Sequence, residues 1–163
     1  MDPQYPISFT LNGREVRQEV STRTTLADLL RHQIGLTATH VGCEQGSCGA
    51  CSLMVDGRMI RSCLVFAIQL DGAVVETAEG FAEDPVMDAL RKGFADRNAL
   101  QCGFCTGGML VAARDLLNRE TAPSREVIRE FISGNFCRCT GYEAIVDAIS
   151  QVAQATAQPQ DAV

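Results

Sequence analysis

With 163 residues, the chain is long enough for one domain of ordinary size or two small ones, and small domains rarely stay folded on a hydrophobic core alone. Its 20 acidic and 14 basic residues give a net charge of −6, which argues against a nucleic-acid partner because phosphate binding needs a basic surface. No apolar run approaches the roughly 20 residues that span a bilayer. No signal peptide is visible at the N-terminus, so we expect a cytoplasmic chain whose cysteines stay reduced.

The first predicted element is a β-hairpin. Apolar and polar residues alternate over residues 7–11, the turn dipeptide Asn12-Gly13 follows, and a second short apolar run covers residues 16–20. A helix comes next, because Thr25 and Asp28 have the spacing of a capping box and apolar residues then recur at helical period. Gly35 stands where this helix of about ten residues would end.

Three more strands are predicted before the middle of the chain. Short apolar runs over residues 52–55, 58–63 and 73–77 are separated by the turn dipeptides Asp56-Gly57 and Asp71-Gly72. The resulting element order, ββαβββ, predicts a small α+β sheet domain.

The hydrophobic period changes to that of helices after Gly80. Asp84-Pro85 has the pattern of an N-cap followed by proline at the first helical position, and Thr140 with Glu143 has the spacing of another capping box. We therefore predict a second domain of four helices. They cover residues 86–94, 106–118 and 124–132, and the stretch from Thr140 onward.

The change of period places a domain boundary near residues 78–84. The first domain is then expected over residues 1–80 and the second over residues 81–155. Residues 156–163 are polar and lack an apolar period, which predicts a frayed or disordered tail. Each domain contains four of the eight cysteines.

The first four cysteines have the spacing C-x4-C-x2-C-x11-C, which is that of plant-type [2Fe–2S] ferredoxins. Glycines stand between the first three, and glycine permits the close approach of a backbone that wraps a cluster. The fourth is expected on a strand, although it could instead be a small buried apolar residue. The set is Cys43, Cys48, Cys51 and Cys63.

The second four cysteines have the spacing C-x2-C-x31-C-x1-C and form two pairs, each before a predicted helix. Helix N-termini offer free N–H groups and a positive dipole end to an anionic cluster. Spacing alone leaves a structural zinc site open here, because two cysteine pairs also describe zinc ribbons. Each set is complete at four thiolates, so we predict two [2Fe–2S] clusters. This set is Cys102, Cys105, Cys137 and Cys139.

Four strings of residues surround the cysteines: CEQGSCGAC at 43–51, RSCL at 61–64, QCGFCT at 101–106 and GNFCRCTGY at 134–142. They closely resemble the small iron–sulfur subunit of the molybdenum hydroxylases, the family of xanthine dehydrogenase and aerobic carbon monoxide dehydrogenase. The resemblance covers about residues 6–153 in a single order. Four motifs at matching separations are far more specific than one cysteine pair.

The resemblance implies a β-grasp, plant-ferredoxin-like N-terminal domain with one [2Fe–2S] cluster and a four-helix C-terminal domain with the other. It also implies a large partner subunit with the molybdenum–pterin cofactor and a medium subunit with FAD. Electrons would pass from molybdenum through the helical-domain cluster and the ferredoxin-like cluster to the flavin, with no substrate chemistry on this chain. By the same carry-over Gln101 contacts the pterin and Cys139 lies close by.

The substrate is not encoded in these motifs. Relatives oxidise carbon monoxide, aldehydes, N-heteroaromatic compounds and acyl-CoA thioesters, and the resemblance favours an N-heteroaromatic substrate. One departure from many relatives is Gly107 in place of proline, which predicts a different local rigidity beside the second site.

Other readings of the chain stay open at this point. It could be a free-standing two-cluster ferredoxin without a permanent partner, or a zinc-stabilised interaction module. His32 and His40 do not stand at ligand spacing from a cysteine pair, so we expect both to be solvated or half-buried. Arg138, between two ligands, could balance the charge of a cluster or face a cofactor phosphate.

Overall fold

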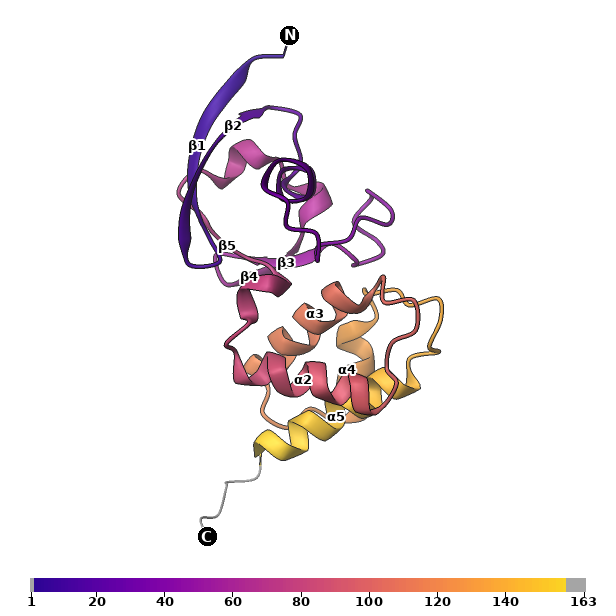
Figure 1. Ribbon diagram of the computed structural model, residues 1–163. Helices are drawn as coiled ribbons and strands as arrows, with labels where there is room; N and C mark the ends of the chain where they lie inside the picture. The colour runs from indigo at the N-terminus through magenta and orange to yellow at the C-terminus, as the bar shows by residue number, and fades with distance from the viewer. Residues whose placement is uncertain (1, 158–163) are drawn as a thin grey trace.

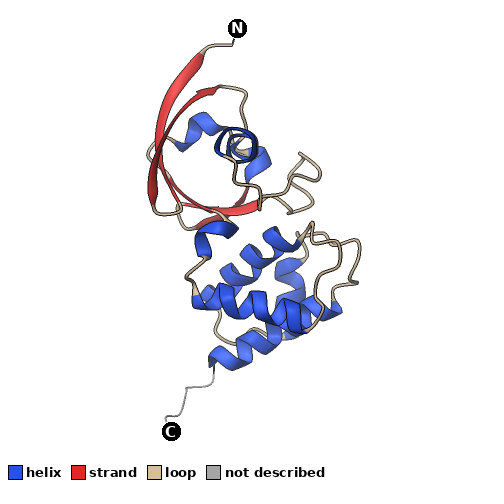
Figure 2. Ribbon diagram, viewed as in Figure 1, coloured by secondary structure: helices blue, strands red, loops and turns tan. Residues whose placement is uncertain are grey.

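The sheet and the long helices occupy separate parts of the structure. The computed structural model describes residues 2–157, with a curved sheet in the N-terminal half and a bundle of helices in the C-terminal half (Figure 1; Figure 2). Within these residues no helix is long and apolar enough to cross a membrane. The α+β fold class expected from the sequence is confirmed.

Five strands form one mixed sheet in the order β2-β1-β5-β3-β4. β1 and β5 run parallel, and the other neighbouring strands are antiparallel. The last strand in sequence thus lies between the two hairpins and joins them. The strands are β1 Gln4–Leu11, β2 Arg14–Ser21, β3 Ser52–Val55, β4 Arg58–Arg61 and β5 Val74–Glu76.

Two of the predicted turn dipeptides close the hairpins. β1 and β2 meet at Asn12-Gly13, whose φ angles are 50° and 77°, and β3 and β4 meet at Asp56-Gly57, with 49° and 72°. Two successive positive φ angles are typical of the two-residue turn that matches the twist of the strands.

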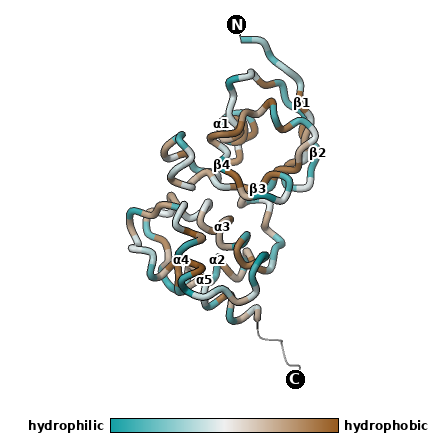
Figure 3. The backbone as a smooth tube through the Cα atoms, turned by 180° about the vertical axis from the view of Figure 1, so that it is seen from behind, coloured by the Kyte–Doolittle hydropathy of each residue, from teal (hydrophilic) through white to brown (hydrophobic). Residues whose placement is uncertain are grey.

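The sheet curves around a helical segment, α1 (Leu26–Asp28) continued by the π-helical turns η1 (Leu29–Ile34). Thr25 caps it as predicted, accepting a hydrogen bond from the Asp28 amide at 3.1 Å, and Gly35 ends it with φ of 88°. Three leucines of the segment are fully buried in the core beneath the sheet. This apolar interior is brown in Figure 3.

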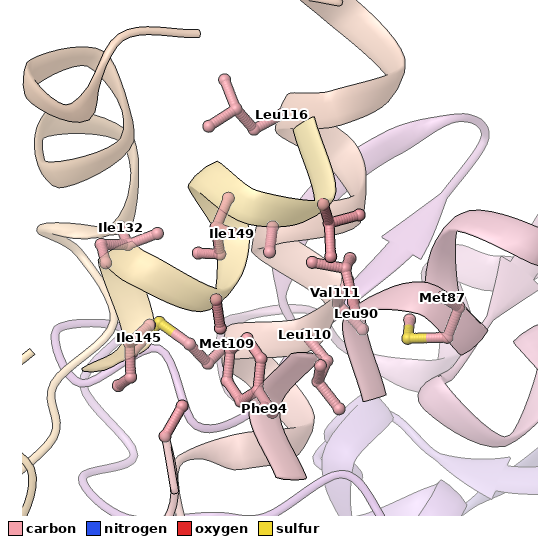
Figure 4. Packing of buried hydrophobic residues seen from close by; sticks show 14 of the residues in the cluster. Met87, Leu90, Phe94, Met109, Leu110, Val111, Leu116, Ile132, Ile145 and Ile149 are labelled. Carbon is pink, nitrogen blue, oxygen red and sulfur yellow. The ribbon is translucent and has the colours of Figure 1, made fainter. Parts of the chain in front are cut away.

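Four helices form the C-terminal half, as predicted. Asp84 and Ser124 cap α2 and α4, because each side chain accepts a hydrogen bond from the amide three residues on, at 2.8 and 3.3 Å. The inner faces of the helices bury a core in which Phe94, Met109 and Ile145 lie together (Figure 4). The helices are α2 Pro85–Asp96, α3 Thr106–Arg119, α4 Arg125–Ile132 and α5 Glu143–Ala157.

Cys63 is not on a strand, so this part of the sequence prediction is wrong. β4 ends at Arg61 opposite Ser52, the first residue of β3, and the chain then turns into the 3-10 segment η2 (Ser62–Leu64). The turn carries Cys63 back towards the start of β3, where the Ser62 hydroxyl donates a hydrogen bond to the Cys51 carbonyl at 2.9 Å. Two further 3-10 segments flank β5, η3 (Ala67–Leu70) and η4 (Ala78–Phe81).

The last helix is also shifted relative to the prediction. α5 begins at Glu143 and not at Thr140, because Gly141 and Tyr142 have φ angles of 68° and 70°, which no right-handed helix contains. It continues through Ala157, past the expected start of the polar tail. The rest of that tail lies outside the described residues.

Candidate metal centres

The loop before β3 contains three of the first four cysteines. Positive φ angles, among them 77° at Gly46 and 73° at Gly49, fold this loop back on itself. As a result the amides of Gln45 and Cys48 lie 3.4 and 3.5 Å from the Cys43 sulfur. Backbone N–H groups directed at a sulfur stabilise its anionic form, which is the form that binds iron.

Two thiols of the first set have pKa values shifted in opposite directions. Hydrogen bonds from the Gln45 and Cys48 amides lower the pKa of Cys43 to about 6. Burial, followed by the hydrogen bond with Cys51, raises the pKa of Cys63 to about 11. Neighbouring thiolates repel one another unless a cation compensates their negative charge, and a bound metal supplies the positive charge.

The second set joins two loops of the helical half. Cys105 is the N-cap residue of α3, and the sulfurs of Cys102 and Cys139 are 3.5 Å apart. Cys137 and Cys139 precede α5, but three residues separate even Cys139 from Glu143, the first residue of that helix. The prediction of a helix N-terminus therefore holds at Cys105 of the first pair and is wrong for the second pair.

Local hydrogen bonds again distinguish the sulfurs of this set. Burial, followed by the neighbouring Cys137, raises the pKa of Cys105 to about 12. Burial also acts to raise the pKa of Cys137, but the Thr140 hydroxyl, 3.1 Å from its sulfur, and nearby amides lower it on balance. The hydroxyl of Tyr142 accepts a hydrogen bond from the Cys137 amide at 2.8 Å and so orients the loop that contains Cys137 and Cys139.

The donor sets fit two-iron clusters better than single zinc ions. Within residues 2–157, no three Cys, His, Asp or Glu side chains gather as ligands of one ion. A structural zinc needs four ligands around one centre, whereas a two-iron cluster takes two thiolates on each iron. The buried hydroxyl of Thr106, which has no hydrogen-bond partner among the described residues, adds a free donor next to Cys105.

The outer edge of the second site is open to solvent. Gln101, Cys102 and Cys139 are all exposed, and Arg138 is exposed between Cys137 and Cys139. The residues predicted to face the pterin therefore share one accessible surface.

Both histidines are placed as expected. His32 is exposed, and His40 is half-buried. The ring of His40 stacks on Phe104 with centroids 4.8 Å apart, and its Nδ1 lies 2.8 Å from the Phe104 carbonyl oxygen. His40 thus connects the sheet half to the second cysteine loop by packing and hydrogen bonding.

The two cysteine loops touch where the halves of the chain meet (Figure 1). The Phe136 amide donates a hydrogen bond to the Cys48 carbonyl at 2.8 Å. The side chain of Asn135 donates to the Gly49 carbonyl at 3.1 Å, and Arg61 donates to the same loop of the helical half. Sequence reasoning missed these roles of Arg61 and Asn135; both stand inside the quoted strings, but nothing in their spacing indicates a shared partner.

Gly107 and Gly108 let α3 lie directly against the sheet half. A Cβ atom on Gly107 would be 2.6 Å from the Ala38 carbonyl oxygen, and one on Gly108 would be 2.2 Å from that of Gly49. Neither position has room for a side chain. The departure from proline at Gly107 therefore coincides with a close contact between the two halves.

Two family models match the chain, one on each half. The model described as 2Fe-2S iron-sulfur cluster binding domain matches residues 9–82, and the model described as [2Fe-2S] binding domain matches residues 77–150. Together they include all eight cysteines.

Similar proteins extend the match to the whole chain. The gamma subunit of caffeine dehydrogenase from a Pseudomonas species is 46% identical over 92% of each chain. The small subunit of nicotine 6-hydroxylase from Paenarthrobacter nicotinovorans is 46% identical over 88% of this chain and 86% of its own. The crystal structure of quinoline 2-oxidoreductase from Pseudomonas putida 86 superposes with a TM-score of 0.89 and 50% identity, covering 94% of this chain and 96% of the matched chain.

Proposed function

The chain belongs to the family of small [2Fe–2S] subunits of the molybdenum hydroxylases, and on that basis we propose which of its residues do the work of the electron-transfer subunit. When bound, each cluster accepts one electron and passes it on. Cys43, Cys48, Cys51 and Cys63 hold one cluster, and Cys102, Cys105, Cys137 and Cys139 hold the other. The approach of thiols from separate loops, with the sulfurs of Cys102 and Cys139 3.5 Å apart, is the observation that supports this assignment.

We also propose that the two halves of the chain are separate domains. Residues 1–80 form the ferredoxin-like domain and residues 81–155 the second cluster domain. Two separate apolar cores support the division, one inside the curved sheet and one among α2 to α5. A cytoplasmic location follows from the eight free thiols, which need a reducing compartment until the clusters form.

The large catalytic subunit covers the edge of the second site. Three large apolar side chains lie exposed around these cysteines, Leu100, Phe104 and Phe136, at 39%, 47% and 55%. An exposed apolar patch of this kind is typical of a protein interface. Gln101 and Cys139 lie at the same surface, and we assign to them the contact with the pterin of the molybdenum cofactor.

A flavin subunit would lie against the first site. Leu64, next to the ligand Cys63, is 58% exposed, and Phe66 is 47% exposed. These two side chains form an exposed apolar surface beside the first cysteine loop, where Leu64 lies against Gly46. We expect Leu64→Asp to weaken capture of an FAD-containing subunit by the tagged complex while the large subunit stays bound; equal loss of both subunits would contradict the assignment.

The substrate class that the relatives favour is an N-heteroaromatic compound. Caffeine, nicotine and quinoline, named in the similar proteins, all contain a nitrogen heterocycle. Substrate-dependent bleaching of the purified complex tests this with caffeine, nicotine and quinoline against carbon monoxide and a simple aldehyde. Bleaching by an aldehyde alone would replace the N-heteroaromatic assignment.

The order of the two sites is tested by removing one ligand from each. In the complex, Cys105→Ser should block electrons next to molybdenum, so substrate reduces neither cluster. Cys48→Ser should leave the second cluster reducible by substrate but stop transfer to the flavin. Normal flavin reduction in both variants would disprove the serial path. Two measurements on the native protein test the other readings. Metal analysis that found zinc in place of iron would exclude this function. Size-exclusion chromatography would exclude it too if the chain eluted alone near 17.6 kDa.

A further inference from the structure

We propose that Arg61, with Asn135 and Ser52, is a positioning residue that holds the two cluster loops at a fixed separation and so sets the rate of electron transfer between them. The inference rests on the proposed function, because it assumes a cluster in each loop. It concerns residues that ligate nothing and that lie between the two sites.

The contact that matters is the hydrogen bond between the Phe136 amide and the Cys48 carbonyl, at 2.8 Å. Cys48 is a ligand of the first set, and Phe136 immediately precedes Cys137, a ligand of the second. The path from the Cys48 sulfur to the Cys137 sulfur therefore consists of covalent bonds and this one hydrogen bond. One electron leaving the second site and arriving at the first has this as a direct bonded route.

Asn135 fastens the loop of the helical half to the sheet half. The residue is 1% exposed. The Nδ2 group donates to the Gly49 carbonyl at 3.1 Å and to the Ser52 hydroxyl at 3.3 Å. Both acceptors lie in or directly after the first cysteine loop, so Asn135 holds the residue before Phe136 against the residue after Cys48.

Arg61 ties the same two segments together from the other side. Its Nη1 donates to the Ser52 hydroxyl at 2.6 Å, and its Nη2 donates to the Gly134 carbonyl at 2.9 Å and more weakly to the Asn135 side-chain oxygen at 3.4 Å. The Ser52 hydroxyl in turn donates to the Gly49 carbonyl at 2.5 Å. A planar fork with several fixed donors makes these bonds at once, which a lysine ammonium cannot do.

The contact leaves no room for adjustment. A Cβ atom on Gly49 would lie 2.4 Å from the Gly134 carbonyl oxygen, and one on Gly134 would lie 2.9 Å from Nη2 of Arg61. The two backbones are therefore already as close as glycine permits. Arg61 has no carboxylate partner among the described residues, so its charge also faces two sites that are anionic when loaded.

The experiment separates position from charge in the purified complex. Arg61→Lys keeps the charge and loses the fork, Arg61→Gln loses the charge, and Gly134→Ala displaces the guanidinium without changing Arg61 itself. Arg58→Gln is the matched control, because Arg58 is an exposed arginine of the same strand. Each variant is checked for wild-type iron content and reduced with dithionite. Electron paramagnetic resonance then reports the magnetic splitting between the two reduced clusters, which falls steeply with their separation.

We expect Arg61→Lys and Gly134→Ala to reduce the splitting and to slow electron transfer between the clusters, because both quantities fall as the separation of the clusters grows. The midpoint potentials stay unchanged in Arg61→Lys and fall in Arg61→Gln, because lost positive charge disfavours the reduced state. Arg58→Gln changes neither splitting nor rate. Should Arg61→Lys lose iron, Ser52→Ala replaces it in the test, since it removes only the hydroxyl that Arg61 and Asn135 share. Ser52→Ala should likewise reduce the splitting.

Wild-type splitting and rates in both Arg61→Lys and Gly134→Ala would overturn the inference. The proposed function fails in a different way. In that case the spectrum of the wild-type complex would lack the signals of two reduced clusters after the substrate is added. The two failures are therefore distinguishable in one set of spectra.

Discussion

Two glycines with nearly the same φ angle differ in what surrounds them, and this makes a direct test of how closely the two halves approach. Gly49 has φ of 73° and Gly57 has φ of 72°. A Cβ atom on Gly49 would lie 2.4 Å from the Gly134 carbonyl oxygen and 2.8 Å from the Asn135 Cα, whereas one on Gly57 would meet nothing within 4 Å. Alanine at either site pays the same left-handed strain, and only Gly49→Ala adds a clash.

The magnitudes follow from these two terms. Left-handed strain costs about 1–2 kcal/mol for a residue with a Cβ atom, and this is the whole expected effect of Gly57→Ala. Overpacking against backbone that cannot withdraw adds about 1–3 kcal/mol. Gly49→Ala should therefore destabilise the chain by about 2–5 kcal/mol in total.

Thermal unfolding of the iron-loaded protein, followed by visible circular dichroism of the clusters, measures both variants. At roughly 2–4 °C per kcal/mol for a chain of this size, Gly57→Ala lowers Tm by about 2–8 °C and Gly49→Ala clearly further. Gly49→Ala should also weaken the splitting between the reduced clusters, which Gly57→Ala leaves intact. Equal losses of Tm in the two variants would refute the close contact between the cysteine loops.

Three further predictions concern the rest of the chain. Asp84→Ala removes the cap of α2 and an ion pair with Arg114 that is less than one-fifth exposed on either side, and should cost about 2–4 kcal/mol in urea unfolding. Burial raises the pKa of Asp84 but Arg114 lowers it on balance, so this difference persists above about pH 4 and shrinks only below it; a difference that instead vanished near pH 7 would contradict the ion pair. Phe94→Ala, in the centre of the helical core, should cost about 3–5 kcal/mol, and a loss below about 1 kcal/mol would mean that this core is not close-packed. Removing iron with a chelator should raise amide exchange in the loops at 43–51 and 134–142 but not in α2; unchanged loop exchange would show that the loops are ordered without metal.

Local signals were sufficient for most of the secondary structure. Asn12-Gly13 demands positive φ angles that match a hairpin, and Asp84-Pro85 provides a side-chain acceptor and a residue without an amide where a helix has an amide to spare. These signals involve residues a few positions apart. The elements that they mark can therefore be predicted without knowledge of the rest of the chain.

The errors arose where side-chain contacts and the end of a strand pairing, and not capping or apolar spacing, decided the outcome. Thr140 has the spacing of a capping box, but its hydroxyl instead lies 3.1 Å from the Cys137 sulfur, and the helix starts at Glu143. Cys63 lies outside β4 because the pairing of β3 with β4 ends at Ser52 and Arg61. Neither outcome follows from the capping or apolar spacing on which the prediction rested.

The eight thiols, their grouping into two complete sets and the family they indicate were determined by the sequence alone, because ligand number and spacing are properties of the chain itself. Only the tertiary structure decided how the two sites meet. The hydrogen bond from Phe136 to Cys48 and the clamp of Arg61 and Asn135 join residues more than seventy positions apart. Such contacts exist only once the sheet and the helices have packed, since loop closure over that distance carries no local sequence signal.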